Sequence, residues 1–378
     1  MQDNPLSLAT LDEMMTAIPE TMRAFVLMGH GDFDQLQLHH DWPVPAPTTD
    51  QVLIKIKACG LNNTDINTRT GWYSKSVTSA TTGGTYEGDQ DDDGGWDGGL
   101  DFPRIQGGDP VGIVVATGEN ADAALIGRRV IVDTITRDWS DPMNYERTNY
   151  LGSAIDGGFA DYMVIDHRNV HPIESGYTDA ELATFAIAYS TAENMLNRAA
   201  VTNEDVVLIP GASGGVGSAL VQLANRRGAK TIAMASTAKH SDVAKLNPDA
   251  ILPREVDNLP SALLEAIGQC SVSVVADIVG GSQFPALIEV LQRGGRYTCS
   301  GAIAGPMVEL DLRTMYLRDL RFHGCTIFEP KVFPSLVKYI EAGEIKPMLA
   351  ASYPFEKLHE AQRAFVDKRH TGNIAVTM

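Results

Sequence analysis

Short runs of alternating apolar and polar side chains characterise the first half of the chain, from Met22 to about Tyr177. In the clearest run, residues 52–58, the apolar side chains at alternate positions are Val52, Ile54, Ile56 and Ala58. A period of two is typical of a strand with one buried face, because successive side chains point to opposite sides. Similar runs occupy residues 23–28, 112–116, 128–132 and 159–165. The pattern predicts a mainly β half.

A helical period replaces this alternation after Thr178. Residues 179–188 and 191–199 are expected to be helices, and residues 215–226 carry one apolar helix face formed by Val216, Ala219, Leu220, Leu223 and Ala224. Strand-like runs alternate with helices at residues 206–209, 231–235, 274–278, 296–300 and 321–327. This order predicts an α/β domain with a doubly wound parallel sheet. The chain ends with two helical stretches and a strand at residues 373–376.

One segment, residues 76–101, has an unusual composition. It contains no basic residue, and its acidic residues gather among glycines: Glu87, Asp89, Asp91, Asp92, Asp93, Asp97 and Asp101. Such a composition predicts an exposed, flexible loop. Asp89, Asp91 and Asp93 mimic the start of a calcium-binding loop, but Leu100 stands where that loop needs a bidentate glutamate. A solvated surface insertion is therefore favoured over a calcium site.

The balance of charge narrows the choice of partners and compartment. A net charge of −18 argues against nucleic acid as a partner, because binding to phosphates needs clustered lysine and arginine. The acidic N-terminus lacks the features of a signal peptide, and no apolar run reaches the roughly 18 residues of a membrane span. A cytoplasmic protein without a membrane partner is expected. The four cysteines, Cys59, Cys270, Cys299 and Cys325, are far apart and are expected to be buried thiols.

A glycine-rich turn between a predicted strand and a predicted helix is the strongest chemical signal. The sequence VVLIPGASGGVG places Gly211, Gly214, Gly215 and Gly217 at this junction, with Ser213 and Val216 among them. Glycines there allow a tight turn and a close approach of the backbone to a pyrophosphate, which lies at the helix N-terminus. The spacing is GxxGGxG and not the usual GxGxxG, but the flanking strand and helix favour dinucleotide binding over a simple connector.

The end of the next predicted strand indicates which dinucleotide binds. A site for NAD carries an acidic residue there for the ribose 2′-hydroxyl, whereas this chain has Ser236 and Lys239. Because a cation can neutralise a 2′-phosphate, NADPH is expected to be the cofactor. The alternative is that Lys239 is a solvated helix residue.

Five motifs in order resemble the medium-chain dehydrogenase/reductase superfamily, and within it the quinone oxidoreductase branch. They are CGLNNTDINTRTGWY (59–73), FPRIQGGDPVGIVVATG (102–118), DGGFADYMVI (156–165), GASGGVG (211–217) and TGNIAV (371–376). The resemblance implies a mainly β, GroES-like catalytic domain at residues 22–177 and 328–378, and a Rossmann domain at residues 178–327. Residues 1–21 are then an N-terminal extension.

Zinc-dependent members of that superfamily carry ligands that this chain lacks. Asn62 and Asn63 stand where those members have the catalytic cysteine and the histidine after it. Gly107, Gly108 and Asp109 replace a Gly-His-Glu motif, and residues 133–157 contain no cysteine for a structural zinc lobe. The resemblance therefore implies an enzyme without a metal. His167 and His171, four residues apart, are interpreted as ordinary surface histidines.

The resemblance also implies a substrate site. Candidate hydrogen-bond donors to the substrate are Asn62, Arg69 and Tyr73. Asp65 is expected to hold their loop and is a candidate partner of Arg69. Each also has a purely structural interpretation. Asn62 can cap a turn, Asp65 and Arg69 can form an ion pair within a helix, and Tyr73 can simply form part of the pocket wall.

Further cofactor contacts follow from the same resemblance. Thr191, after a predicted helix break, is placed beside the nicotinamide as a ligand or as a helix cap. Ile303 and Phe328 are expected to line the nicotinamide pocket, and Asn373 to lie near the cofactor. Residues 308–327 resemble the edge strand through which family members dimerise, so a homodimer is expected.

Without zinc, the chain has lost the group that polarises a simple carbonyl, so its substrate must be electrophilic by itself. The expected function is hydride transfer from NADPH to a quinone or an α,β-unsaturated carbonyl compound. Two alternatives stay open at this stage. One is reduction of a larger conjugated thioester or a specialised aldehyde, and the other is a non-catalytic NADPH-binding protein.

Overall fold

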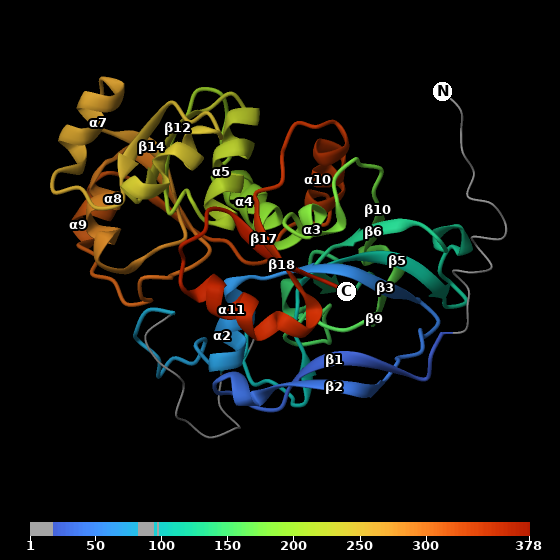
Figure 1. Cartoon of the computed structure of the whole chain (residues 1–378). Helices are drawn as coiled ribbons and strands as arrows, with labels where there is room; N and C mark the ends of the chain where they lie inside the picture. Colours follow the sequence, from blue (N-terminus) through green and yellow to red (C-terminus); the bar gives the residue numbers. More distant parts are fainter. Residues whose placement is uncertain (1–17, 82–93, 97) are drawn as a thin grey trace.

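The structure is a computed structural model that describes residues 18–81, 94–96 and 98–378. It contains a mainly β body and an α/β body, which share an extended contact (Figure 1). This architecture confirms the predicted fold class. Most of the N-terminal extension and the three aspartates of the calcium-loop mimic, at positions 89, 91 and 93, lie outside the described residues.

The β body combines strands from both ends of the chain. They are β1 (Thr21–Leu27), β2 (Leu36–Pro43), β3 (Gln51–Gly60), β4 (Arg104–Ile105), β5 (Asp109–Thr117), β6 (Arg129–Val132), β7 (Ile135–Arg137), β8 (Thr148–Tyr150), β9 (Tyr162–Asp166), β10 (Val170–Pro172), β17 (Leu349–Pro354) and β18 (Asn373–Thr377). The main sheet has the order β10-β6-β5-β3-β18-β17, and β9 also pairs with β3. Because β18 pairs antiparallel with β3, the C-terminal strand is part of the sheet formed by the first half of the chain.

The α/β body contains six parallel strands in the order β13-β12-β11-β14-β15-β16. Their bounds are β11 (Val206–Pro210), β12 (Lys230–Ala235), β13 (Ala250–Pro253), β14 (Val272–Asp277), β15 (Leu291–Cys299) and β16 (Arg321–Gly324). The strand order reverses between β11 and β14. In such sheets ligands bind beyond the carboxyl ends of the strands at the reversal point, so the Gly-rich turn after β11 lies where a ligand is expected.

The helices of the described chain cover the sheets and join the two bodies. They are α2 (Asn63–Thr70), α3 (Asp179–Leu182), α4 (Ala186–Arg198), α5 (Gly215–Arg226), α6 (His240–Ala244), α7 (Leu259–Ile267), α8 (Phe284–Glu289), α9 (Leu312–Leu317), α10 (Val332–Glu341) and α11 (Leu358–Val366). Helices α5 and α10 both pack on α4. The assignment of α10 to the catalytic domain, with boundaries at 177/178 and 327/328, stays a prediction, since one apolar core spans α4, α5 and α10.

The helix break predicted before Thr191 is wrong. The interruption falls earlier, between α3 and α4, and α4 passes through Thr191 without a break. Ser190 and Thr191 are weak helix formers, which suggested an end there. Burial of Tyr189, Ala192 and Met195 in the core outweighs that preference, because tertiary packing contributes more than local propensity.

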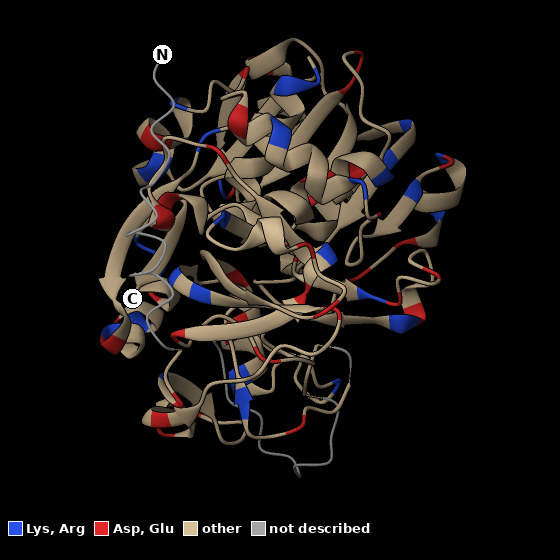
Figure 2. Ribbon diagram, turned by 90° about the vertical axis from the view of Figure 1, so that its right-hand side faces the viewer, with Lys and Arg blue, Asp and Glu red and all other residues tan. Residues whose placement is uncertain are grey.

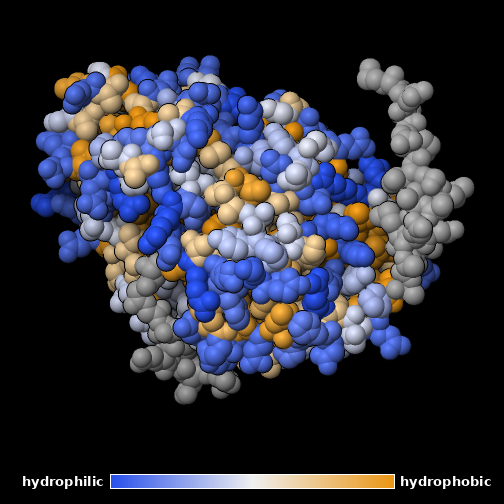
Figure 3. All heavy atoms as spheres, in the orientation of Figure 1, coloured by the Kyte–Doolittle hydropathy of each residue, from blue (hydrophilic) through white to orange (hydrophobic). Residues whose placement is uncertain are grey.

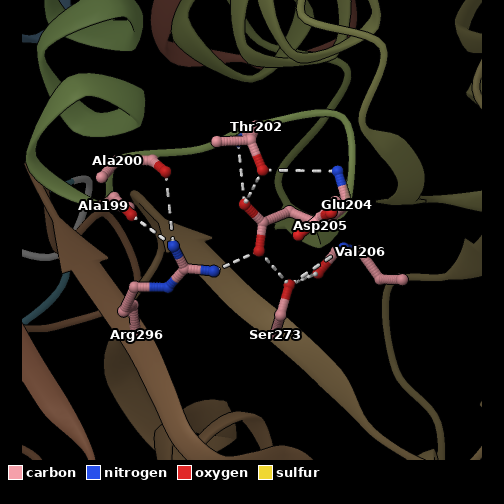
Figure 4. A network of polar contacts seen from close by, with 8 residues as sticks. All are labelled: Ala199, Ala200, Thr202, Glu204, Asp205, Val206, Ser273 and Arg296. Atoms are coloured by element: carbon pink, nitrogen blue, oxygen red, sulfur yellow. Dashed lines mark hydrogen bonds and ion pairs between the residues drawn. The ribbon is translucent and has the colours of Figure 1, made fainter.

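A polar network links neighbouring strands of the parallel sheet at their amino ends, away from the carboxyl ends where a ligand is expected (Figure 4). Asp205, just before β11, accepts hydrogen bonds from the Thr202 N–H at 2.8 Å and from the Ser273 hydroxyl at 2.7 Å. The Arg296 guanidinium, from β15, forms an ion pair with the same carboxylate. Burial alone would raise the pKa of Asp205, but these hydrogen bonds and the Arg296 charge outweigh it and leave the pKa below its usual value. The network therefore ties three strands together away from the ligand end.

Surface properties agree with an ordinary acidic globular protein. Acidic and basic residues lie interspersed along the ribbon of the described chain (Figure 2). The face shown in Figure 3 is mostly hydrophilic, with hydrophobic side chains grouped at its upper left, around α7. None of the helices in the described part of the chain is long and apolar enough to cross a bilayer. The four cysteines are not all buried as expected, since Cys270 is exposed and Cys299 is only partly buried.

Candidate active site

The Gly-rich turn has the close backbone packing that its glycines allow. Gly211 has a φ of +69°, in the left-handed region that favours glycine. A Cβ atom on Gly217 would lie 2.2 Å from the Gly211 carbonyl oxygen, so a side chain there would force the turn open. Gly214 caps α5 without a side-chain hydrogen bond. The N-terminus of α5 thus keeps N–H groups that can bind an anion.

The C-terminal segment packs directly against this turn. The Gly372 N–H donates to the Ser213 carbonyl at 2.8 Å, and Gly372 forms a β-bridge with Gly214. A Cβ on Gly215 would lie 2.2 Å from Oδ1 of Asn373, so a side chain at position 215 would displace the Asn373 amide. Asn373, which begins β18, is therefore next to the turn, although the two are far apart in sequence.

A cavity of about 460 Å³ opens beside the turn, between the two bodies. Its lining includes seven of the predicted site residues, namely Asn62, Tyr73, Thr191, Gly215, Val216, Ile303 and Asn373. Asp65, Arg69, Gly211, Ser213, Gly214, Ser236, Lys239 and Phe328 do not line it. No Asp, Glu, Lys, Arg or His from the described residues lines this cavity. Its walls are aromatic, aliphatic, amide, hydroxyl and thiol groups, so its interior suits an uncharged ligand.

Asn62, at the start of α2, is fixed by two buried carboxyl groups. Its backbone N–H donates to Asp65 at 2.7 Å, and its amide Nδ2 donates to Asp109 at 2.8 Å. Asp109, at the start of β5, also accepts from the Ile187 N–H at 2.6 Å. Burial raises the pKa of both Asp65 and Asp109 to about 7, in each case against the effect of these hydrogen bonds. Asn62 thereby presents its amide to the cavity in a defined orientation.

Sequence reasoning noted Asp109 only as a departure from the zinc motif and missed its role as the partner of Asn62. A sequence signal for this pairing existed, because each residue lies in a motif that contains a zinc ligand in the zinc-dependent pattern. Two motifs that hold the same metal must meet in space. The amide of Asn62 and the carboxyl group of Asp109 are complementary hydrogen-bonding partners.

Arg69 does not fill its predicted role as a substrate donor. Its side chain is buried, and it donates to the Gly31 carbonyl at 2.9 Å and to Gln362 at 3.2 Å. The guanidinium carbon also lies 4.3 Å from the centre of the Phe33 ring. The proposed ion pair with Asp65 is wrong as well, since the Arg69 ion pair is with Asp32 at 3.4 Å. Both Asp65 oxygens accept backbone N–H groups instead, from Asn62 and Gly107.

Tyr73 and Thr191 both line the cavity. The Tyr73 hydroxyl donates to the Thr64 hydroxyl at 3.2 Å, and burial raises the pKa of Tyr73. Thr191 lies within α4 and so is not a helix cap; its contact with the cofactor stays a prediction. Ile303 lines the cavity from the loop after β15, and its carbonyl accepts from the Thr81 N–H at 3.1 Å.

Phe328, expected in the nicotinamide pocket, is elsewhere. It is buried in the core around α4 and α10, and the Arg137 guanidinium carbon lies 5.1 Å from its ring centre. Because β16 ends at Gly324, earlier than the predicted residue 327, the residues that reach the cavity are Gly324, Cys325 and Thr326. The prediction was shifted along the chain by a few residues.

Lys239 and Lys368 form a basic cluster next to the C-terminal segment. The Lys239 ammonium donates to the carbonyls of Lys368, at 2.7 Å, and His370. The Lys368 ammonium donates to Oδ1 of Asn63 at 2.8 Å and lies 3.8 Å from the centre of the Phe365 ring. Neither lysine forms an ion pair with an acidic group of the described chain.

The environment of this cluster suits an anion. Burial, together with the nearby Lys239 charge, lowers the pKa of Lys368 to about 7. Burial and the charge of Arg254 lower the pKa of Lys239. Ser236 directly follows β12, and its carbonyl accepts the Lys239 backbone N–H at 2.8 Å. Sequence reasoning missed Lys368, because its partners come from distant segments.

Metal ligands are not grouped in the part of the chain that the structure describes: no cluster of three or more His, Cys, Asp or Glu side chains could hold an ion there.

His171 is not the surface histidine that was expected. Its ring packs on Phe333 with the ring centres 4.9 Å apart, and burial lowers its pKa to about 4.

Comparison with protein families matches residues 48–175 to the alcohol dehydrogenase GroES-like domain and residues 215–342 to the zinc-binding dehydrogenase family. This chain belongs to the medium-chain dehydrogenase/reductase superfamily. Within the superfamily it falls in the quinone oxidoreductase-like branch, as the five motifs predicted, and it is an oxidoreductase.

Similar proteins match this chain over most of its length. The quinone oxidoreductase of Homo sapiens is 26% identical over 354 residues, which cover 91% of this chain and 94% of that one. The chloroplastic NADPH-dependent alkenal/one oxidoreductase of Arabidopsis thaliana is 24% identical, over 95% of this chain and 80% of the other. A solved structure from Sinorhizobium meliloti 1021, provisionally named an alcohol dehydrogenase, has a TM-score of 0.86 and 42% identity, and the match covers 97% of this chain and 99% of that one.

Proposed function

We propose that this oxidoreductase works without zinc and uses NADPH to reduce a quinone or the carbon–carbon double bond of an α,β-unsaturated carbonyl compound. The observation that carries the proposal is the uncharged cavity beside the Gly-rich turn, with the Asn62 amide held by Asp109 where zinc-dependent relatives place a metal. The names of the human and Arabidopsis relatives support the same class of acceptor.

The residues around the turn fit a phosphorylated dinucleotide. The N-terminus of α5 and the close packing of Gly211 and Gly217 suit a pyrophosphate. Neither Lys239 nor Lys368 forms a close ion pair with an acidic group of the described residues, and burial and a neighbouring cation lower the pKa of each, so a phosphate group would favour their charged forms. Together they favour NADPH over NADH, since NADPH carries the additional phosphate. When bound, NADPH supplies the hydride.

The cavity lining favours an acceptor that is already activated. A simple aldehyde or ketone needs strong polarisation of its oxygen, which a metal ion or a charged donor supplies. This lining offers neutral hydrogen-bond donors, notably the Asn62 amide and the Thr191 hydroxyl. An amide group has two N–H donors, and Asp109 accepts one of those of Asn62. The second can donate to the oxygen on which charge develops when a quinone or enone is reduced.

Apolar side chains of the same lining limit the access of water. Ile187, Val216 and Ile278 face the cavity, and with Ile303 they reduce the local dielectric constant. A hydrogen bond from a fixed amide stabilises developing charge more strongly in such surroundings than in water. Asp65 and Asp109 act indirectly in this proposal, since they hold Asn62 and do not line the cavity.

We also propose a homodimer, formed through β16. This strand lies at one edge of the six-stranded sheet, so its outer backbone groups are available for pairing. Large apolar side chains are exposed close to it in the sequence: Met307, Leu312, Tyr316 and Leu317. Light scattering on the purified protein measures the mass directly.

The test of function follows NADPH absorbance with chelator-treated protein and a panel of quinones, enones and simple aldehydes. We expect turnover of quinones or enones, a preference for NADPH over NADH and no loss of rate after chelation. Turnover of simple aldehydes only, or dependence on added zinc, would overturn the proposal. Tight NADPH binding without turnover of any acceptor would instead indicate a binding protein.

A further inference from the structure

The acidic insertion contributes an aromatic side chain to the wall of the cavity. Trp96 lines the cavity, and its ring stacks on that of Tyr150, with ring centres 4.9 Å apart and planes inclined by 25°. Tyr150 also lines the cavity and is 7% exposed. The two rings come from segments far apart in the sequence, since Tyr150 ends β8. A nearly parallel stacked pair therefore forms one flat part of the wall.

Contacts on both sides of Trp96 hold it in place. Gly94 lies so close to His30 and Gly71 that a Cβ would be 2.7 Å from Nε2 of His30. The Gly95 N–H, next to Trp96 in the chain, donates to the Gly98 carbonyl at 2.8 Å. Leu100 then enters the core of the β body. The position of the indole is therefore set by described backbone contacts and by packing on Tyr150.

The other described end of the insertion reaches the α/β body. The Thr81 N–H donates to the carbonyl of Ile303, a residue of the cavity wall, at 3.1 Å. The Trp72 indole N–H, in the chain just before, donates to the Ser79 carbonyl at 2.9 Å. Thr81 and Trp96, from the two described ends of the insertion, thus both line the cavity, as does Trp72 just before it.

The chemistry of this wall selects for shape and polarisability and not for charge. Five aromatic rings line the cavity, those of Trp72, Tyr73, Trp96, Tyr150 and Phe365. Aromatic rings gain energy from offset or edge contacts with another ring, beyond the area that they bury. An aliphatic chain of similar length obtains no such gain.

We propose that Trp96 is a specificity-determining residue that selects acceptors carrying an aromatic ring conjugated to the reducible group, over small aliphatic enones. The inference rests on the proposed function and adds the class of substrate. Tyr150 serves as the positioning residue that keeps the indole plane in the wall.

The experiment compares two enones that differ only in the group on the β-carbon. Benzylideneacetone carries a phenyl ring there, and ethylideneacetone carries a methyl group. We expect Trp96→Leu to lower kcat/KM for benzylideneacetone about tenfold, mainly through KM, because ring stacking is lost. The value for ethylideneacetone should change by less than about twofold, and Trp96→Phe should restore most of the discrimination.

Trp42→Leu is the matched control, since Trp42 is also partly buried but lines a different cavity. Its ratio of the two kcat/KM values should equal that of the wild type. If Trp96→Leu retains the melting temperature but changes both enones alike, or neither, Trp96 does not determine specificity.

Binding separates this proposal from the proposed function. Quenching of intrinsic fluorescence gives the affinity of benzylideneacetone whether or not it is reduced. Failure of the wild type to reduce either enone or any quinone of the panel would contradict the proposed function. Loss of benzylideneacetone affinity in Trp96→Leu would still support the specificity role, and unchanged affinity would overturn it.

Discussion

Replacing Lys239 by methionine tests the preference for NADPH. The change removes the charge but keeps an unbranched apolar side chain of similar length. Hydrogen bonds that involve a charged group contribute about 1.5–3 kcal/mol, which corresponds to a factor of roughly 10 to 150 in an equilibrium constant. Because the Lys239 ammonium is half-buried and already directed by two backbone carbonyls, little side-chain freedom is lost when a phosphate binds. We therefore expect the KM for NADPH to rise by at least about tenfold.

NADH provides the internal control, because it lacks the 2′-phosphate. Its KM should rise by less than about threefold, an allowance for the two lost hydrogen bonds to the backbone. Lys245→Met is the matched variant, since Lys245 follows α6, is exposed and pairs with Asp242 at 2.7 Å. Steady-state rates with both cofactors measure these values. An equal rise for NADH and NADPH would show that Lys239 only supports the backbone at residues 368–370, and an unchanged KM for NADPH would refute the reasoning outright.

Three further predictions concern stability and cofactor affinity. Asp205→Asn should lower the free energy of unfolding by about 3 kcal/mol in urea titrations, because it leaves the Arg296 charge without its partner. The KM values should stay unchanged. A variant as stable as the wild type would contradict the role of this network. Gly217→Ala should weaken NADPH binding at least about tenfold in fluorescence titrations, since its Cβ would lie 2.2 Å from the Gly211 carbonyl oxygen. NADPH affinity should fall as the pH rises from about 7 to about 9, where the 2′-phosphate is already fully ionised. The pKa of Lys368 is lowered to about 7, so below that pH the ammonium is already charged, and above it phosphate binding requires proton uptake. Lys368→Met should remove this slope, and a slope that persists would exclude Lys368.

The fold was largely predictable because periodicity and turn chemistry are local. The alternation at residues 52–58 lies within β3, and the apolar face at residues 215–226 corresponds to α5. The predicted break before Thr191 was wrong because local propensity favoured it and core packing of α4 opposed it. Burial that depends on distant segments leaves little trace in a single stretch of sequence.

The predictions for the site succeeded and failed for the same reason as those for the fold. Gly215, Val216 and Asn373 lie at the turn and cavity as expected, because each is close to a strand end whose position follows from the topology. The environment of Arg69 was not predictable, since Phe33 and Gln362, which contact it, come from opposite ends of the chain. Asn62 pairs with Asp109 only after the fold brings their segments together. The same is true of Lys239 and Lys368, whose charges act on each other across distant segments.

Deuterium transfer in metal-stripped protein tests the central claim most directly. NADPH deuterated at C4 of the nicotinamide, on the face that the enzyme uses, is incubated with chelator-treated protein and benzylideneacetone, and the zinc content is measured on the same sample. The account predicts saturated ketone with deuterium on the β-carbon, formed in proportion to the NADPH oxidised, while zinc is substoichiometric. A product reduced at the carbonyl carbon, or transfer that returns only when zinc is added, would contradict it.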